Sequence, residues 1–275
     1  MPPFSSDIFM RAGGLTAVYL PYNITDEDLY PLLDQINGVY FTGGDLDLYN
    51  PETGELHPYS VTGLKILNYA KQVKDSQAEH FPILGICQGL ELLHILVANN
   101  TDALGWSTLE NATVNTRFVD ANPQKESRLY SLFPESALEA METENILWHF
   151  HHRSVPVYNY LKYPQLREFF KILSVNLIDD QYIVASAEAR DYPIYLTQFH
   201  PEVVMEPAND INAVRTPTTA QIAFSFANWL AVESAKSTHR WRDYEEMRGW
   251  MVKNGDPQGE IEFVKEMVKA YGFDY

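Results

Sequence analysis

The chain has 275 residues, a length that fits one large domain or two small ones at about 100–200 residues per domain. Hydrophobic residues make up 45% of it, which is ample for a globular core, and no run approaches the roughly 18 consecutive apolar residues of a membrane span. The formal net charge of −17 argues against nucleic acid or an anionic membrane as a partner.

Helix-like and strand-like patterns alternate along the first hundred residues. In chain order they predict a helix over residues 5–12, a strand over 15–20, a helix over 26–36, a strand over 38–41, a helix over 61–75, a buried strand over 81–86 and a helix over 88–98. The helix over 26–36 is expected to be capped by Thr25 and interrupted by Pro31.

The second half continues the alternation after a polar stretch over residues 101–131, which is expected to be irregular. The pattern predicts strands over 145–150, 169–176, 182–187 and 194–199 and a helix over 220–237. Such alternation implies an α/β fold with a mostly parallel sheet and helices on both faces. We assign residues 1–237 to this domain and 238–275 to a charged, aromatic helical extension, which packs either on the body or on a partner.

Cys87, the only cysteine, lies between two glycines in the sequence Gly85-Ile86-Cys87-Gln88-Gly89. The predicted strand ends and the predicted helix begins here, as in a nucleophile elbow with Cys in place of Ser. Such a turn is strained, so the residues two positions away must be small, and the helix N-terminus favours the thiolate. The alternative is a small buried hydrophobic residue. The pattern alone is moderately specific, and a nucleophile needs a base.

A candidate base follows the last predicted strand, in the sequence His200-Pro201-Glu202. Pro201 biases His200 toward extended backbone, in which residues i and i+2 point to the same side. Glu202 can then fix the tautomer of His200 and stabilise its imidazolium, as the third group of a catalytic triad does. The alternative is a surface histidine beside a loop carboxylate, and the cysteine elbow favours the triad.

The segments "GICQGLE" and, about a hundred residues later, "YLTQFHPE" resemble the class I glutamine amidotransferase superfamily. Within it, "INGVYFTGGDLDLY", "FFKILSVN" and "AQIAFSFANWLAVESAK" are most similar to the γ-glutamyl hydrolases, peptidase family C26. The resemblance covers roughly residues 5–236 and implies a flavodoxin-like three-layer αβα sandwich.

The glycine pair Gly43-Gly44 resembles the family's Pro-Gly-Gly loop, with Thr42 at the proline position. By resemblance, the backbone N–H of Gly44 or Gly43 and that of Gln88 hold the oxyanion of a tetrahedral intermediate. Each donor of this kind contributes about 3–4 kcal/mol. The alternative is an ordinary glycine turn.

The segment "WHFHHRSV" contains three histidines, which invites a metal site. We expect none, because the only cysteine is used elsewhere and no nearby carboxylate completes a ligand set. By resemblance, His151 and Glu91 line the substrate cleft. Arg153 is one of few cations expected near that cleft. The alternatives are a polar loop around the histidines and simple solvation of a helix by Glu91.

The resemblance implies a cysteine hydrolase that cleaves γ-glutamyl amide bonds, those of folate polyglutamates, through a γ-glutamyl thioester without metal or organic cofactor. The expected partner is a small-molecule γ-glutamyl substrate, and a homodimer stays open. Two alternatives are a glutaminase subunit of an amidotransferase and an impaired relative. Because folate polyglutamates are polyanions, the net charge demands either a local cationic cluster or an acidic compartment.

The N-terminal region departs from the family, which by resemblance begins with a buried strand ahead of the first helix. In flavodoxin-like order that strand is central, so its absence predicts a gap with unpaired backbone groups on both sides. The chain begins without the apolar stretch of a secretory signal. Sequons at Asn23, Asn99 and Asn111 are compatible with the lysosomal, vacuolar or extracellular location that the resemblance implies.

Overall fold

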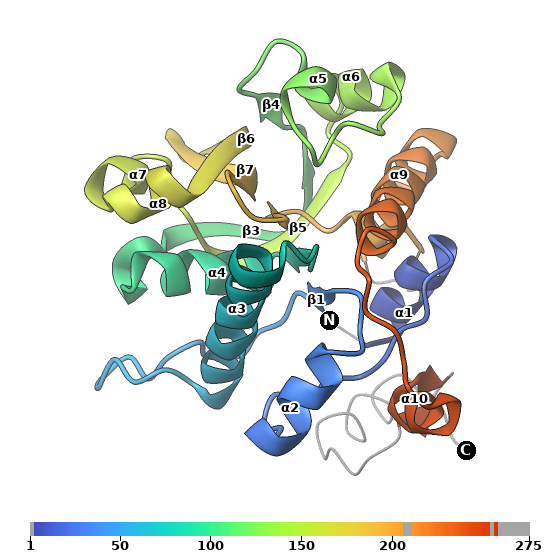
Figure 1. The fold of residues 1–275 in the computed structure, drawn as a ribbon. Coiled ribbons are helices and arrows are strands. Elements are labelled where there is room, and N and C mark those ends of the chain that lie inside the picture. The colour runs from blue at the N-terminus through green and yellow to red at the C-terminus, as the bar shows by residue number, and fades with distance from the viewer. Residues whose placement is uncertain (1–2, 206–210, 254–255, 258–275) are drawn as a thin grey trace.

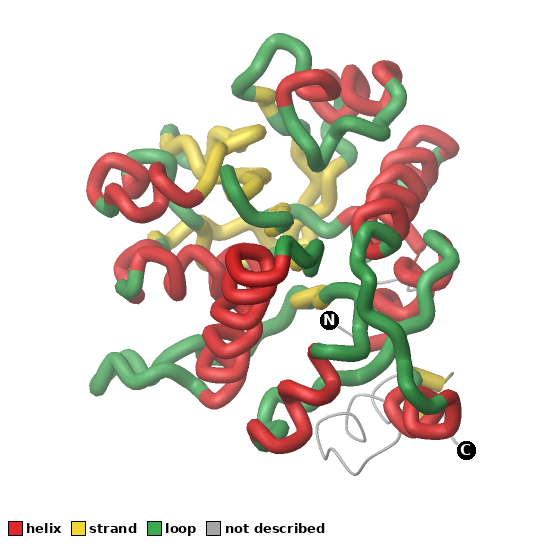
Figure 2. The backbone as a smooth tube through the Cα atoms, viewed as in Figure 1, coloured by secondary structure: helices red, strands yellow, loops and turns green. Residues whose placement is uncertain are grey.

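The computed structural model describes residues 3–205, 211–253 and 256–257, and there the chain forms three layers around a central sheet (Figure 1). Figure 2 shows the strands gathered inside and the helices around them. The sheet has six strands within the described residues, in the spatial order β1 (Val39–Phe41), β2 (Ile83–Ile86), β8 (Ile194–Thr197), β7 (Gln181–Ala189), β6 (Phe170–Ile178) and β4 (Arg117–Phe118).

The sheet is mixed, which corrects the expectation of a mostly parallel one. β1, β2 and β8 are parallel, whereas β8, β7, β6 and β4 pair antiparallel. For the pairs β6–β7 and β7–β8 the reason is a short connection, because a parallel crossover needs a dozen or more residues. β6 and β7 are joined by Asp179 and Asp180 alone, whose φ angles of 48° and 61° fit a type I′ hairpin turn.

Helices cover both faces of the sheet, so the expected αβα sandwich is confirmed. One face packs against α2 (Asp26–Leu33), α3 (Pro58–Gln77), α4 (Gln88–Ala98), α7 (Asn159–Lys162) and α8 (Pro164–Phe169). The other packs against α1 (Pro3–Ala12), α6 (Glu135–Thr143) and α9 (Pro217–Ser234). Short helical turns complete the connections: η1 (Thr101–Ala103), α5 (Pro123–Glu126) and η2 (Pro201–Met205).

Strands β2 and β8 are buried on both faces because their side chains alternate between two apolar cores. Ile83 and Leu196 belong to the core under α3 and α4, whereas Leu84 and Tyr195 belong to the core under α9. Both neighbouring layers are apolar, so these strands appear in the sequence as continuous apolar runs. The two strands therefore form a rigid centre, and the candidate catalytic residues follow their carboxyl ends.

The predicted helices agree closely with α1, α3, α4 and α9. Helix α2 ends at Leu33, earlier than predicted, and contains Pro31. Thr25 occupies its N-cap position but makes no side-chain capping bond, and its hydroxyl instead donates to the Asp28 carboxylate at 3.3 Å. Helix α6 was not predicted.

The stretch over residues 101–131, expected to be irregular, contains a ten-residue strand. β3 (Gly105–Val114) pairs antiparallel with β5 (Leu147–Ser154) in a separate two-stranded ribbon. The register of the ribbon shifts twice, between Trp106 and Leu109 and between Leu109 and Ala112. These irregularities remove the strict alternation that reveals a strand in a sequence.

The predicted strand over residues 15–20 is absent, since this segment makes a single bridge, between Val18 and Met251. The described strands pair without interruption from β1 to β4, so the predicted central gap is also wrong for the described residues. β1 lies at the edge of the sheet, and the continuous ladder leaves no unpaired slot beside β2.

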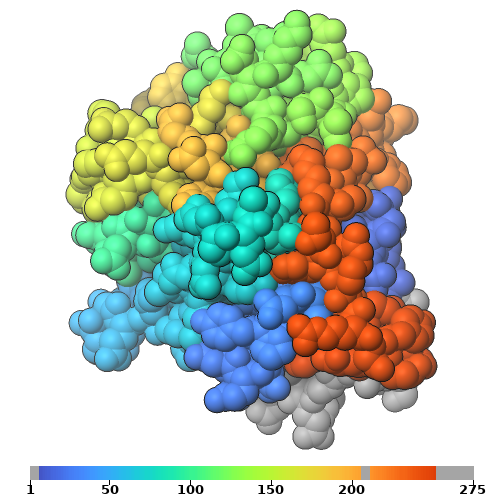
Figure 3. All heavy atoms as spheres, in the orientation of Figure 1, coloured from blue at the N-terminus to red at the C-terminus, as the bar shows by residue number. Residues whose placement is uncertain are grey.

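The segment after α9 runs back along the body, between α3 and the N-terminal elements (Figure 3). Glu79 accepts hydrogen bonds from the Ser237 hydroxyl (2.9 Å) and the Thr238 backbone N–H (2.7 Å). Helix α10 (Tyr244–Trp250) follows, and Trp241 and Trp250 pack against the core under α3. Then come β9 (Val252–Lys253) and β10 (Asp256–Pro257), and most of the predicted extension beyond them lies outside the described residues.

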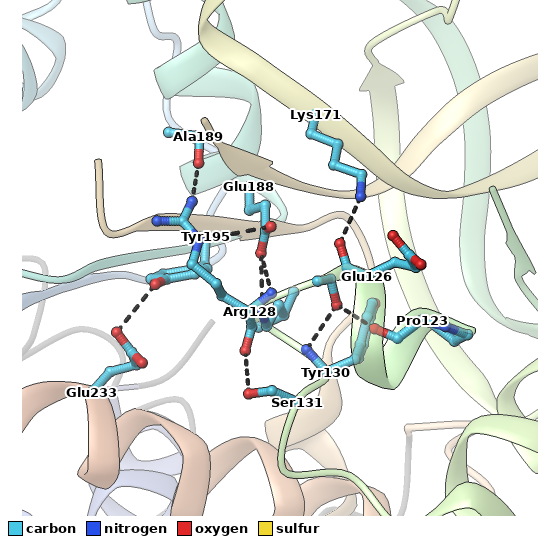
Figure 4. A network of polar contacts seen from close by, with 12 residues as sticks. Pro123, Glu126, Arg128, Tyr130, Ser131, Lys171, Glu188, Ala189, Tyr195 and Glu233 are labelled. Carbon is cyan, nitrogen blue, oxygen red and sulfur yellow. Dashed lines mark hydrogen bonds and ion pairs between the residues drawn. The ribbon is translucent and has the colours of Figure 1, made fainter. Parts of the chain in front are cut away.

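A buried polar network fixes α9 to the sheet (Figure 4). Glu188 on β7 accepts hydrogen bonds from the backbone N–H groups of Arg128 (2.9 Å) and Leu129 (3.1 Å). The Arg128 guanidinium lies over the Tyr195 ring, 5.3 Å from its centroid. The Tyr195 hydroxyl donates to Glu233 of α9 at 3.1 Å. One chain of contacts thus joins β7, β8 and α9.

Candidate active site

Cys87 lies at the turn between β2 and α4, in a backbone conformation that few L-residues adopt (φ 51°, ψ −105°). The two flanking glycines are required by close packing. A Cβ atom on Gly85 would lie 2.8 Å from the backbone of Gly89, and one on Gly89 would lie 2.6 Å from the Phe41 carbonyl oxygen. The expected strained, glycine-flanked elbow is therefore present.

The Cys87 thiol is 3% exposed, and its surroundings oppose the expected thiolate. Burial raises the pKa of Cys87 well above its ordinary value, and the charges of Glu91 and Glu202 raise it further. A hydrogen bond from the Gln88 backbone N–H lowers it but is outweighed. The helix N-terminus therefore does not by itself produce a thiolate, and a proton acceptor is needed at the moment of reaction.

His200 follows β8, and η2 carries Glu202. The two side chains are 3% and 0% exposed, and His200 Nδ1 lies 2.9 Å from Glu202 Oε1. Because a carboxylate only accepts, the proton of a neutral His200 sits on Nδ1 and its Nε2 is free to accept another. This is the tautomer that a general base requires.

Strand β5 brings the surroundings of Cys87 and His200 together. The Trp148 carbonyl accepts the backbone N–H of His200 at 2.9 Å, and the Phe150 carbonyl accepts the Cys87 thiol at 3.6 Å. These carbonyls are two residues apart on one strand, a separation of about 7 Å. The Cys87 backbone N–H in turn donates to the Thr197 carbonyl of β8 at 2.7 Å.

The Gly43-Gly44 loop lies between the same groups. A Cβ atom on Gly43 would clash with His200 Cε1, and one on Gly44 would lie 2.6 Å from the side-chain oxygen of Gln88. The Gln88 side-chain amide donates to the Leu46 carbonyl at 2.6 Å, which holds the loop against the first turn of α4. The three residues predicted for an oxyanion hole are thus neighbours of the elbow and of the imidazole.

Glu91 is buried, with 7% of its surface exposed, so its alternative interpretation as a solvating residue is wrong. Burial raises the pKa of Glu91 to about 7, although a hydrogen bond from Gln198 Nε2 (3.2 Å) and the charge of Arg153 act in the opposite direction. Asp45 raises this pKa as well. Near neutral pH the carboxyl next to the thiol therefore changes its charge.

His151 is 4% exposed and joined to a second buried histidine. Its Nδ1 contacts the Ser107 carbonyl at 2.9 Å, and its Nε2 lies 3.2 Å from His149 Nδ1. Burial lowers the pKa of His151 to about 4 and that of His149 well below its ordinary value. Both are therefore neutral above pH 5, and the carbonyl of Ser107 places the His151 proton on Nδ1.

Arg153 lies on the same face of β5 as His149 and His151. Its guanidinium is 5.5 Å from the Tyr49 ring centroid and 5.4 Å from that of Trp106, and it donates to the Tyr49 hydroxyl at 3.0 Å. Tyr49 also lines an open pocket of about 510 Å³, which lies over the loop after Gly44 and not over Cys87. Arg153 thus contacts Tyr49 at this pocket, and its charge also acts on Glu91.

Among the described residues, no group of three or more His, Cys, Asp and Glu side chains is arranged to hold a metal ion. Sequence reasoning missed three residues near the site. Gln198 contacts Glu91, Trp148 contacts His200, and Tyr40 contacts Glu202. Gln198 could have been found, because it alternates with His200 at the end of the strand. The position of Trp148 depends on the ribbon register, which carries no local signal.

The chain is similar to known glutamine amidotransferases and γ-glutamyl hydrolases. Residues 14–213 match the family described as glutamine amidotransferase class-I. The chain is 30% identical over 233 residues to gamma-glutamyl hydrolase 1 of Arabidopsis thaliana, covering 84% of this chain and 64% of that protein. It is 28% identical over 237 residues to the gamma-glutamyl hydrolase of Rattus norvegicus, covering 86% and 71%.

The structure is also similar to that of a glutamine amidotransferase from Thermotoga maritima, with a TM-score of 0.47 and 13% identity over 83% of this chain and 90% of that one. The part of the Arabidopsis relative that this chain matches is less than two thirds of that protein's length. The family match covers more than half of the chain, including the elbow, the glycine loop and the His-Pro-Glu segment. The chain therefore belongs to the class-I glutamine amidotransferase family.

Proposed function

We propose that the protein is a cysteine hydrolase that cleaves γ-glutamyl amide bonds, with Cys87, His200 and Glu202 as its catalytic triad. The proposal rests on the buried 2.9 Å contact between His200 and Glu202. These two residues follow β8, which pairs with β2, and Cys87 directly follows β2. The relatives named gamma-glutamyl hydrolase support the choice of bond.

The first half-reaction transfers the γ-glutamyl group to sulfur. His200 Nε2 accepts the thiol proton, and Cys87 Sγ attacks the γ-carbonyl carbon. Gly43 or Gly44 and Gln88 donate backbone N–H groups to the resulting oxyanion. The tetrahedral intermediate then expels the amine, which takes a proton from His200, and the γ-glutamyl thioester remains.

The second half-reaction returns the enzyme to its starting state. His200 accepts a proton from a water molecule, whose oxygen attacks the thioester carbonyl, and Cys87 leaves as thiolate and recovers the proton. Glu202 holds the imidazole in the required tautomer through both steps. Protons and electrons balance over the two half-reactions, which use only these side chains, the backbone N–H groups and water.

We further propose that the substrates are folate polyglutamates. We propose the lysosome, the vacuole or the extracellular space as the location of the protein. The relatives' name, gamma-glutamyl hydrolase, supports a substrate with γ-glutamyl bonds, and two sequons at exposed positions, Asn23 and Asn99, support the location. No helix within the described residues combines the length and apolar character that crossing a bilayer requires. The proposed partner is a small-molecule substrate.

The deciding experiment compares wild type with Cys87→Ser and Cys87→Ala on a γ-glutamyl dipeptide, a penta-γ-glutamyl folate and free glutamine. We expect wild type, and neither variant, to release glutamate or shortened polyglutamates. We also expect a γ-glutamyl adduct on Cys87 in the acid-quenched wild-type protein. Turnover of glutamine alone identifies a glutaminase instead. A Cys87→Ala variant of unchanged activity refutes the mechanism.

A further inference from the structure

Asn111 lies at the second register shift of the β3–β5 ribbon, and its backbone adopts the left-handed conformation with φ at 48°. Asparagine tolerates this conformation better than most residues do. Its side-chain oxygen accepts the indole N–H of Trp148 on β5 at 2.9 Å. The irregularity of the ribbon thus places a hydrogen-bond acceptor at the Trp148 indole.

The same oxygen of Asn111 also contacts a third segment of the chain. It accepts the backbone N–H of Asn212 at 2.6 Å, and the Asn212 side-chain amide donates to the Asn111 carbonyl at 3.3 Å. An amide oxygen has two lone pairs, so it can accept the Trp148 and Asn212 hydrogen bonds together. Because Asn212 follows η2, which carries Glu202, Asn111 joins β3, Trp148 and the segment after the His-Pro-Glu motif.

Trp148 in turn lies against the imidazole of His200. The two ring centroids are 5.1 Å apart with their planes tilted by 60°, and the Trp148 carbonyl accepts the His200 backbone N–H at 2.9 Å. The Phe150 ring stacks on the indole at 6.0 Å. Because Trp148 is buried, rotation of its indole away from Asn111 would leave the N–H donor without an acceptor, which is costly. Asn111 therefore fixes the indole beside His200.

An indole ring at this distance stabilises a neighbouring positive charge. The face of an aromatic ring attracts a cation within about 6 Å of its centroid, and removal of water strengthens the attraction. His200 is buried, and in the proposed mechanism its imidazole becomes positively charged when it accepts the thiol proton. The contact with Trp148 is therefore stronger in the transition state than in the ground state, and only such a contact raises kcat.

Resting on the proposed function, we propose that Asn111 is a positioning residue for catalysis, which holds the Trp148 indole where it stabilises the His200 imidazolium formed during acylation. Glu202 fixes the tautomer of His200 through Nδ1, and the indole adds an aromatic contact to the same ring. Asn111 acts through Trp148, so its effect should appear in kcat and not in KM.

The first test separates the side chain of Asn111 from its backbone conformation. Asn111→Gly tolerates the left-handed backbone but removes the acceptor, so kcat should fall about 2- to 30-fold, the range of a cation–π contact, with KM nearly unchanged. Asn111→Asp keeps an oxygen acceptor and should recover most of kcat. Steady-state kinetics on a γ-glutamyl dipeptide measures both variants. Equal losses of kcat in the two variants, or a change confined to KM, overturn the proposal.

Two control variants test other causes of a lower kcat. Asn99→Gly changes another asparagine with φ at 48°, at the C-terminal end of α4, and should leave kcat and KM unchanged. Asn111 also belongs to the sequon Asn111-Ala112-Thr113, which Thr113→Val removes while the Asn111 side chain remains. Thr113→Val from the same expression host should keep the wild-type kcat. A loss equal to that of Asn111→Gly would assign the effect to a glycan and refute the positioning role.

The second test changes the electrons of the Trp148 ring at nearly constant shape. Site-specific replacement of Trp148 by monofluoro- and trifluorotryptophan withdraws electron density from the ring face, which weakens its attraction for a cation. The value of kcat should fall stepwise with the number of fluorine atoms. A constant kcat across the series would show that the indole acts by packing alone and would overturn the proposal.

Failure of the proposed function gives a different result. If wild type hydrolyses no γ-glutamyl compound, NMR spectroscopy of the Cys87→Ala variant still tests the arrangement of Asn111, Trp148 and His200. The Trp148 ring current should shift the Hε1 resonance of His200, and Asn111→Gly should reduce this shift while Asn111→Asp retains it. An Hε1 resonance unchanged by Asn111→Gly refutes the positioning role independently of activity.

Discussion

The Tyr40 hydroxyl lies close to the buried Glu202 carboxylate. Neither this hydroxyl nor the second oxygen of the carboxylate makes a hydrogen bond of ordinary geometry within the described residues. Burial raises the pKa of Tyr40 well above its usual value, and the Glu202 charge raises it further, so the phenol stays protonated. The Ser6 hydroxyl of α1 is also close to it and lacks a partner. A small rotation lets Tyr40 donate to Glu202.

Replacing Tyr40 by Phe should therefore weaken the support of Glu202. Without this donor Glu202 holds the imidazole of His200 less firmly, so kcat should fall about 3- to 20-fold, the cost of one hydrogen bond, with little change in KM. Steady-state kinetics is the measurement. Tyr163→Phe, which removes another buried hydroxyl without a hydrogen bond among the described residues, is the matched control. An equal loss in both variants would indicate a packing effect only.

Glu202→Gln tests the orientation of His200. An amide can donate to Nδ1, which selects the wrong tautomer and no longer stabilises the imidazolium. We expect kcat for acylation to fall about 100- to 10,000-fold with little change in KM, measured in single-turnover reactions. A rise in KM alone would make Glu202 a binding residue.

Glu91→Gln should make the Cys87 thiol more reactive above pH 7. The negative charge of Glu91 raises the pKa of Cys87, and it appears as Glu91 ionises near pH 7. Alkylation by iodoacetamide should be ~3- to 10-fold faster in the variant at pH 8 and similar to wild type at pH 6, where Glu91 is already neutral. Identical rates at both pH values would show that the two groups are independent.

His94 should make the fold sensitive to mild acid. Its ring is fully buried, with Nδ1 2.8 Å from the Leu90 carbonyl and Nε2 2.8 Å from the Tyr160 hydroxyl. Burial lowers its pKa from 6.5 to about 4, so the unfolded chain binds the proton first and stability falls between pH 6.5 and 4. The loss is about 3 kcal/mol.

The check on His94 is chemical denaturation at several pH values. His94→Phe should be less stable at pH 7 because it leaves Tyr160 without its partner, yet its stability should fall less steeply between pH 6.5 and 4. His152→Gln, at an exposed position, is the control and should keep the wild-type slope. A slope unchanged in His94→Phe would assign the acid sensitivity to other groups.

Glu233 should act in a lower pH window. Burial alone would raise its pKa, but hydrogen bonds from His80 and Lys236 outweigh burial and lower it to about 2. Its contribution is complete above pH 4.5 and is lost as the pH falls toward 2. Glu233→Gln should cost about 1–2 kcal/mol at pH 7, allowing for solvent near the site, and almost nothing at pH 2.

The matched variant is Glu245→Gln, which removes an exposed carboxylate on α10. Thermal unfolding from pH 2 to 7 should show its stability curve parallel to that of wild type. If Glu233→Gln and Glu245→Gln give the same curve, the buried contacts of Glu233 contribute no measurable stability.

The elements with a strong local pattern could be predicted from the sequence. α4 begins and ends where the spacing of Leu90 and Leu93 indicates, and the elbow follows from Gly85 and Gly89. The segment over residues 15–20 is apolar enough for a strand, but its backbone is used by the C-terminal segment instead. Local sequence cannot show that competition.

The direction of strands β6 and β7 was open to prediction and was missed. Asp179-Asp180 between two apolar runs is a hairpin signal, because both residues tolerate positive φ. The environment of the candidate site could not be predicted from the local sequence. The raised pKa of Cys87 depends on burial and on the charge of Glu202, which lies more than a hundred residues further along the chain.

The bridge between Val18 and Met251 joins two parts of the chain that are far apart in sequence. The Tyr19 backbone N–H donates to the Trp250 carbonyl at 2.7 Å. Hydrogen–deuterium exchange at that single amide therefore reports whether α10 is docked, because release of the C-terminal segment leaves Tyr19 without this acceptor. We expect the two regions to exchange together, so that a probe near the start of the chain reports an event near its end.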